Sequence, residues 1–124
     1  MNILKKIEIY LCDVIEMELK NKNCAPIKPG TKPLDENQIK ALIRELPPGW
    51  EVIDHKKIRK AFPFANFKRG MTFAQVIALI AEKQNHHPDI CIRYQEVEIM
   101  LSTHSIGGLS ENDFILAAKI DTVY

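Results

Sequence analysis

The chain has 124 residues, of which 46% are hydrophobic and 27% are charged, a balance typical of a single soluble globular domain. Its 17 basic and 16 acidic side chains give a net charge of +1, which excludes the basic surplus that nucleic acids and anionic membranes attract. Three cysteines without a CxxC pair indicate reduced thiols, so we expect a cytoplasmic protein rather than a disulfide framework.

The N-terminal segment is predicted to be an amphipathic helix over residues 1–20. Its apolar residues alternate spacings of three and four: Leu4, Ile7, Leu11 and Val14. Charged residues interrupt this pattern, so the segment is neither a signal peptide nor a membrane span. The next stretch, NKNCAPIKPGTKP, contains three prolines and a glycine and predicts a linker. We therefore assign residues 1–33 to a helix and linker, and residues 34–124 to the main domain. The helix either covers local apolar surface or docks on the main domain or a second copy of the chain.

The main domain begins with a helix that Asp35 and Gln38 start as a capping box. Apolar residues then share one helical face: Ile39, Leu42, Ile43 and Leu46. Pro47, Pro48 and Gly49 end this helix. Two strands are expected next, at residues 50–54 and 57–64, with a tight turn near His55.

A central helix is predicted to begin near Thr72, with Gln75 as its capping-box partner, and to end before Pro88. A second pair of strands follows at about residues 90–94 and 97–103. Ser110 and Asp113 then form a third capping box and start the last helix.

The resulting order is helix, two strands, helix, two strands, helix. Two hairpins favour a four-stranded antiparallel sheet with the helices packed on one face, which is an α+β fold (αββαββα) preceded by the extra N-terminal helix.

Three histidines stand at the ends of predicted elements. His86 and His87 precede Pro88 at the end of the central helix, and His104 follows a strand just before a loop with two glycines. Histidine is the side chain whose unperturbed pKa lies nearest neutrality, so a cluster of histidines suits proton transfer. The three residues are therefore candidates for one acid/base site.

Other roles for these histidines stay open. Taken alone, each histidine could equally well cap a helix or pack against its neighbours without any catalytic role. Three histidines can also bind zinc or iron, but adjacent histidines lack the spacing that aims two imidazoles at one ion, so we expect no metal. A cysteine nucleophile is disfavoured, because Cys91 falls in a predicted strand.

The segment at residues 82–121 closely resembles the pterin-4a-carbinolamine dehydratases. The matching motifs are HHP at residues 86–88, STH at residues 102–104 and GLSxxD at residues 108–113. The PPGW at residues 47–50 and the segment at residues 62–67 also fit the family, so the resemblance covers about residues 34–124.

The resemblance implies a hydro-lyase. Family members remove water from 4a-hydroxytetrahydropterin to give quinonoid dihydropterin, which recycles the pterin cofactor of aromatic amino acid hydroxylases. The hydroxyl on C4a leaves as water when it gains a proton, while N5 loses its proton. These steps need acid/base groups and no metal or redox cofactor.

The same resemblance places His86, His87 and His104 in the pterin pocket as catalytic residues. We assign His87 as the main base or proton shuttle, His104 as the acid at the departing hydroxyl, and His86 as the residue that orients the pterin. The histidine roles are interchangeable on sequence grounds. The other expected binding residues are Pro88, Thr103, Ser105 and Ile106.

Three residues are expected to support the site, each with a second interpretation. Asp113 either orients a histidine or only caps the last helix, and both roles are compatible. Glu82 lies four residues before His86 and either orients that imidazole or faces solvent. Trp50, like Tyr94, either flanks the pocket or belongs to the core. One departure from many relatives is Asp89-Ile90 after the HHP, where they carry an aromatic residue.

The resemblance also implies a homodimer or homotetramer that acts on a small-molecule pterin and has a functional link to an aromatic amino acid hydroxylase. Two alternatives stay open. The first is a protein-interaction role, as the dimerisation cofactor of a transcription factor. The second is a pterin dehydratase of molybdopterin-related metabolism.

Overall fold

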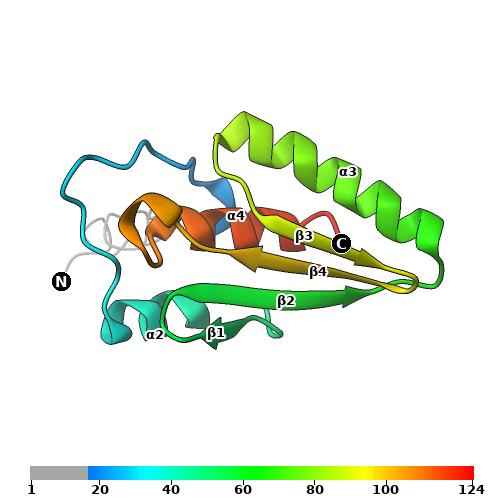
Figure 1. The fold of residues 1–124 in the computed structure, drawn as a ribbon, viewed down its shortest axis with the longest axis horizontal. Coiled ribbons are helices and arrows are strands. Elements are labelled where there is room, and N and C mark those ends of the chain that lie inside the picture. The colour runs from blue at the N-terminus through cyan, green and yellow to red at the C-terminus, as the bar shows by residue number, and fades with distance from the viewer. Residues whose placement is uncertain (1–16) are drawn as a thin grey trace, which may run out of the picture.

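The computed structural model describes residues 17–124. Its elements follow in this order: η1 (Leu19–Asn21), α2 (Glu36–Arg44), β1 (Glu51–Ile53), β2 (Lys57–Pro63), α3 (Phe67–Gln84), β3 (Asp89–Arg93), β4 (Glu96–Leu101), η2 (His104–Ile106) and α4 (Glu111–Asp121). The four strands form one antiparallel sheet in the order β1-β2-β4-β3 (Figure 1). The predicted α+β fold with a four-stranded antiparallel sheet is therefore confirmed.

The hydrophobic core lies on one face of this sheet. Ile58 pairs with Leu101 and Phe62 pairs with Val97, and all four side chains are buried. The same core contains side chains from the three helices: Ile39, Phe73, Ile77, Phe114, Leu116 and Ile120. The helices thus bury their apolar faces against one side of the sheet, as expected for an α+β fold with the helices on one face.

Two of the predicted helix starts and the first hairpin turn are confirmed. The Asp35 carboxylate accepts a hydrogen bond from the Gln38 N–H at 2.8 Å, and the Gln38 side chain accepts one from the Asp35 N–H at 2.9 Å. Ser110 and Asp113 form the capping box at the start of α4. Asp54 and His55 both adopt positive φ angles, so the tight turn between β1 and β2 falls where it was expected.

The predicted start of the central helix near Thr72 is wrong. The helix begins at Phe67, and the Asn66 side chain caps it by accepting a hydrogen bond from the Arg69 N–H at 2.9 Å. The helix continues through Gly70. Because glycine has no side chain, α3 can approach β4 closely at this residue. A Cβ atom at Gly70 would lie 3.2 Å from Cγ2 of Val97. Thr72 is an interior residue whose hydroxyl donates to the Lys68 carbonyl.

Most of the predicted N-terminal helix lies outside the described residues. From Met17 onward, the chain contains the short η1 turn and an extended segment that both pack on the main domain. Leu19 is buried in the core, and Lys119 Nζ donates to the Lys20 carbonyl at 3.0 Å. In the segment predicted as a linker, Lys22 Nζ pairs with Glu111 Oε1 at 2.8 Å, so this segment also contacts α4. Within residues 17–124, none of the helices combines the length and apolar character that crossing a membrane requires.

Trp50 belongs to the core and not to a pocket wall. Its side chain is 7% exposed, and its Nε1 donates a hydrogen bond to Asp121 Oδ2 at 2.6 Å. Lys60 Nζ pairs with the other oxygen of the same carboxylate at 2.5 Å. The indole therefore ties the start of the sheet to the end of α4.

Replacing Trp50 by Phe should lower the free energy of unfolding by about 2 kcal/mol, because it removes a hydrogen bond to a buried carboxylate. Urea denaturation followed by circular dichroism measures this change. Tyr94→Phe is a matched control, since Tyr94 is 74% exposed, and it should change stability by less than about 0.5 kcal/mol. Equal effects of the two variants would contradict the assignment of Trp50 to the core.

Candidate active site

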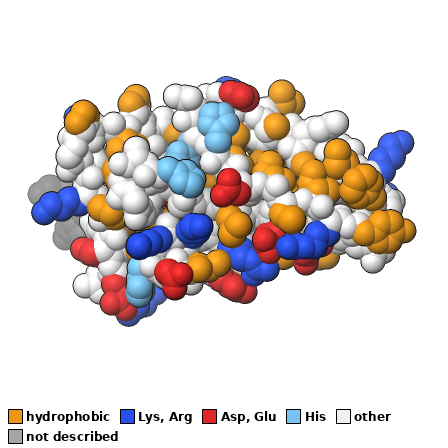
Figure 2. All heavy atoms as spheres, in the orientation of Figure 1, with side chains coloured by type: hydrophobic (Ala, Val, Ile, Leu, Met, Phe, Trp, Pro, Cys, Tyr) orange, Lys and Arg blue, Asp and Glu red, His pale blue; other side chains and the backbone are white. Residues whose placement is uncertain are grey.

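A cleft of about 690 Å³ opens between three parts of the fold. Its walls are the end of α3 with the residues that follow it, residues 102–105 after β4, and the extended segment 24–27. His86, His87 and His104 all line this cleft. The topology therefore brings together histidines that lie up to 18 positions apart in the sequence, and Figure 2 shows two histidine side chains next to one another on this face.

The end of α3 places His86 and His87. The helix stops at Gln84 because Asn85 adopts a left-handed conformation with φ of 50°, three residues before the expected break at Pro88. The His86 N–H donates to the Ala81 carbonyl at 3.2 Å, which closes the end of the helix. Both histidines therefore lie in the segment after the end of α3, where they line the cleft.

His86 is anchored by a buried carboxylate. Its Nε2 lies 2.6 Å from Asp113 Oδ1, and the His86 and Asp113 side chains are 11% and 0% exposed. The Asp113 carboxylate accepts hydrogen bonds from its other neighbours, and we assign it as the acceptor here too. In this assignment, Nε2 of His86 carries the proton and donates a hydrogen bond to Asp113 Oδ1. Nδ1 is then the ring nitrogen that remains for a ligand or for proton exchange.

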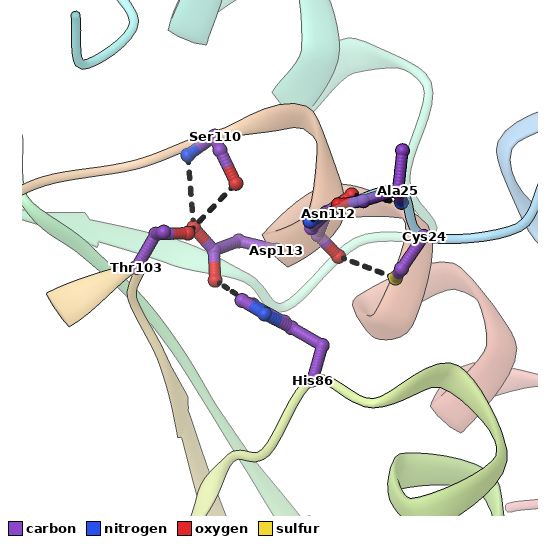
Figure 3. A network of polar contacts seen from close by, with 7 residues as sticks. All are labelled: Cys24, Ala25, His86, Thr103, Ser110, Asn112 and Asp113. Carbon is purple, nitrogen blue, oxygen red and sulfur yellow. Dashed lines mark hydrogen bonds and ion pairs between the residues drawn. The ribbon is translucent and has the colours of Figure 1, made fainter. Parts of the chain in front are cut away.

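Asp113 accepts two more hydrogen bonds, both on Oδ2 (Figure 3). The Thr103 hydroxyl donates at 2.8 Å and the Ser110 N–H donates at 2.9 Å. Thr103 Oγ1 also lies 2.7 Å from Ser110 Oγ, which extends the network. The carboxylate therefore caps α4 and orients a histidine at the same time, so the two interpretations of Asp113 are both supported by the geometry.

One interpretation of the sequence had Glu82 orienting His86, but the structure places Glu82 beside His87 instead. Its Oε2 lies 3.4 Å from Nε2 of His87, and both side chains are exposed to more than half. The helical i, i+4 relation to His86 is lost because Asn85 ends the helix. Glu82 is thus a solvent-facing neighbour of His87.

His104 starts the short helical turn η2 and is exposed. A β-bridge between Thr103 and Gly108 closes the loop that carries it, with N–H to O distances of 2.8 and 3.4 Å. His104 thus stands on a loop whose two ends are held together, and it lines the same cleft as the residues that follow α3.

Only some of the other predicted binding residues line the cleft. Thr103 and Ser105 are among the residues that form its walls, whereas Pro88 and Ile106 are not. Trp50 is also absent from these walls, because its ring is packed in the core.

The extended segment 24–27 is a wall of the cleft that sequence analysis missed. It is fixed to α4, because the Ala25 N–H donates to Asn112 Oδ1 at 3.0 Å and Asn112 Nδ2 donates to the Ala25 carbonyl at 2.7 Å. The Cys24 N–H donates to Gln84 Oε1 at 2.8 Å, which joins the segment to α3. Its proline content was the only signal, and that signal is shared with mobile linkers.

Cys24 contributes no nucleophile to this cleft. Burial raises the pKa of its thiol to about 11, and the Asp113 carboxylate adds to this rise while Lys119 opposes it. The reactive form of cysteine is the thiolate, which is scarce near neutral pH at this pKa. Within residues 17–124, no group of three or more His, Cys, Asp or Glu side chains is arranged to hold a metal ion.

Comparison with known families identifies the chain. The family model described as pterin 4 alpha carbinolamine dehydratase matches residues 32–123. A protein of Rubrobacter xylanophilus, provisionally named pterin-4-alpha-carbinolamine dehydratase, is 46% identical over 104 residues, which cover 84% of this chain and 96% of the relative. A relative of the same provisional name from Alkaliphilus metalliredigens is 44% identical and covers 83% of this chain and 93% of its own. The protein belongs to the pterin-4a-carbinolamine dehydratase family.

Solved structures agree with this assignment. A transcriptional coactivator/pterin dehydratase from Brucella melitensis has a TM-score of 0.69 and 33% identity, and the match covers 74% of this chain and 98% of that chain. A pterin dehydratase-like protein described as a RuBisCO assembly factor in the alpha-carboxysome has a TM-score of 0.52 at 22% identity and shares the fold.

Replacing Asp113 by Asn should lower the free energy of unfolding by about 3 kcal/mol. The amide turns one accepting oxygen into a donor that faces another donor in a buried site. Urea denaturation measures the loss, and Glu82→Gln serves as the control because Glu82 is 78% exposed. The control should change stability by less than about 0.5 kcal/mol. A similarly small effect of Asp113→Asn would show that the network contributes little.

Proposed function

We propose that the protein catalyses the dehydration of 4a-hydroxytetrahydropterin to quinonoid dihydropterin by histidine acid/base catalysis. The observation that carries this proposal is the shared cleft of His86, His87 and His104 in a member of this family. In the reaction, the C4a–O bond breaks as the hydroxyl receives a proton and leaves as water. N5 loses its proton, and its electron pair forms the double bond to C4a.

The surroundings of the histidines favour a division of roles. His86 is nearly buried and bound to Asp113, so it suits binding and orienting the pterin ring. His87 is 55% exposed and His104 is also exposed, so both can exchange protons with solvent between turnovers. We assign His104 as the acid at the departing hydroxyl and His87 as the base that takes up the N5 proton.

Substituting His87 or His104 by Ala should slow dehydration by at least about 100-fold, which is the usual contribution of a positioned proton-transfer group. The assay follows the ultraviolet decay of enzymatically generated 4a-hydroxytetrahydropterin at neutral pH. His55→Asn is the control, because His55 is the remaining histidine and lies in the β1–β2 turn. Asn tolerates the left-handed backbone at this position.

Two results would contradict the proposal in different ways. Near-normal turnover by both alanine variants would reject the histidine mechanism. An unchanged decay rate in the presence of the wild-type protein would reject the activity itself.

The proposal extends to the setting of the enzyme. We place it in the cytoplasm as a homodimer or homotetramer that recycles the pterin of an aromatic amino acid hydroxylase. Analytical ultracentrifugation tests this point, and a monomer at micromolar concentration would contradict it.

A further inference from the structure

A second, smaller cleft of about 240 Å³ adjoins the first. It is lined by Lys56, Lys57, Ser102, His104, Gly107 and Gly108. Ser102 and His104 line both clefts, so the two spaces meet at these side chains. A ligand that occupied both clefts would therefore pass these two side chains.

The smaller cleft is rich in hydrogen-bond donors that carry positive charge. Lys56 and Lys57 each present an ammonium group, which donates and never accepts, and Ser102 adds a hydroxyl. Gly107 and Gly108 have no side chains to fill the space, and a Cβ atom at Gly107 would meet nothing within 4 Å. Figure 2 shows Lys and Arg side chains gathered close to the histidines on this face.

The two lysines are not neutralised within residues 17–124. Neither takes part in an ion pair there, although the next two basic residues of β2 both do. Arg59 pairs with Glu98 at 2.6 Å and Lys60 pairs with Asp121 at 2.5 Å. Lys57 and Ser102 also fall opposite one another when the β2–β4 register is continued by one residue beyond Ile58 and Leu101. The smaller cleft thus carries two positive charges that no ion pair balances within residues 17–124.

We propose that this smaller cleft binds a phosphate ester on the side chain of the pterin, an inference that rests on the proposed function. A phosphate carries up to two negative charges and several acceptor oxygens, which match two ammonium groups and a hydroxyl. The cleft has the volume of roughly eight water molecules, which is enough for such a group. Lys56 and Lys57 then select substrates with a phosphorylated side chain over those with a neutral one.

Isothermal titration calorimetry with neopterin and neopterin monophosphate tests the subsite directly. The wild-type protein should bind the monophosphate about tenfold more tightly, and this ratio should shrink as salt is added, since both lysines are exposed. In the double variant Lys56→Gln/Lys57→Gln the ratio should fall to about one. Lys68→Gln/Arg69→Gln, which removes the same charge at the start of α3, should retain the tenfold ratio.

Equal affinity for the two ligands in the wild-type protein, or an unchanged ratio in Lys56→Gln/Lys57→Gln, would overturn the inference. Inorganic phosphate alone provides a further arm. If it binds in a way that depends on both lysines while the two pterins bind equally, the cleft takes a free anion and the role in substrate selection is rejected.

Turnover separates this inference from the proposed function. Dehydration without a preference for the phosphorylated substrate would reject the subsite alone. A lysine-dependent binding preference without dehydration of either substrate would reject the proposed function and leave the subsite standing.

Discussion

The buried carboxylate of Asp113 is the group on which both the fold and the candidate site depend. A charge without exposure to solvent is tolerated only when its hydrogen bonds are made, and here three donors supply them. The donors come from three separate segments: His86 after α3, Thr103 after β4 and Ser110 before α4. One side chain thus fixes the relative positions of the elements that form the cleft.

This arrangement explains why the three histidines differ in their surroundings. His86 is held against the core by Asp113, whereas His87 and His104 stand on segments that face solvent. A dehydration needs a rigidly placed substrate and also groups that gain and lose protons in every cycle. The fold provides both, because the anchored histidine and the two exposed histidines line one cleft.

The sequence predicts those features that depend on neighbouring residues. The capping boxes at Asp35 and Ser110 and the turn at His55 follow from short-range chemistry, and the sheet follows from the alternation of apolar residues. The partner of His86 did not follow from local spacing, because the i, i+4 relation offered Glu82 and only the family resemblance offered Asp113. The left-handed conformation of Asn85 ends that helix and turns His86 toward Asp113, which lies 27 positions away. The wall at residues 24–27 depends on tertiary hydrogen bonds to Asn112 and Gln84, which no local pattern reveals.

The most direct test of the account is the tautomer of His86, measured by ¹⁵N NMR of the imidazole at a pH where the ring is neutral. Because Asp113 accepts from Nε2, the spectrum should show a protonated Nε2 and an unprotonated Nδ1, and addition of a pterin should shift the Nδ1 resonance. A proton on Nδ1, or rapid exchange between both tautomers, would contradict the claim that Asp113 anchors this histidine for catalysis.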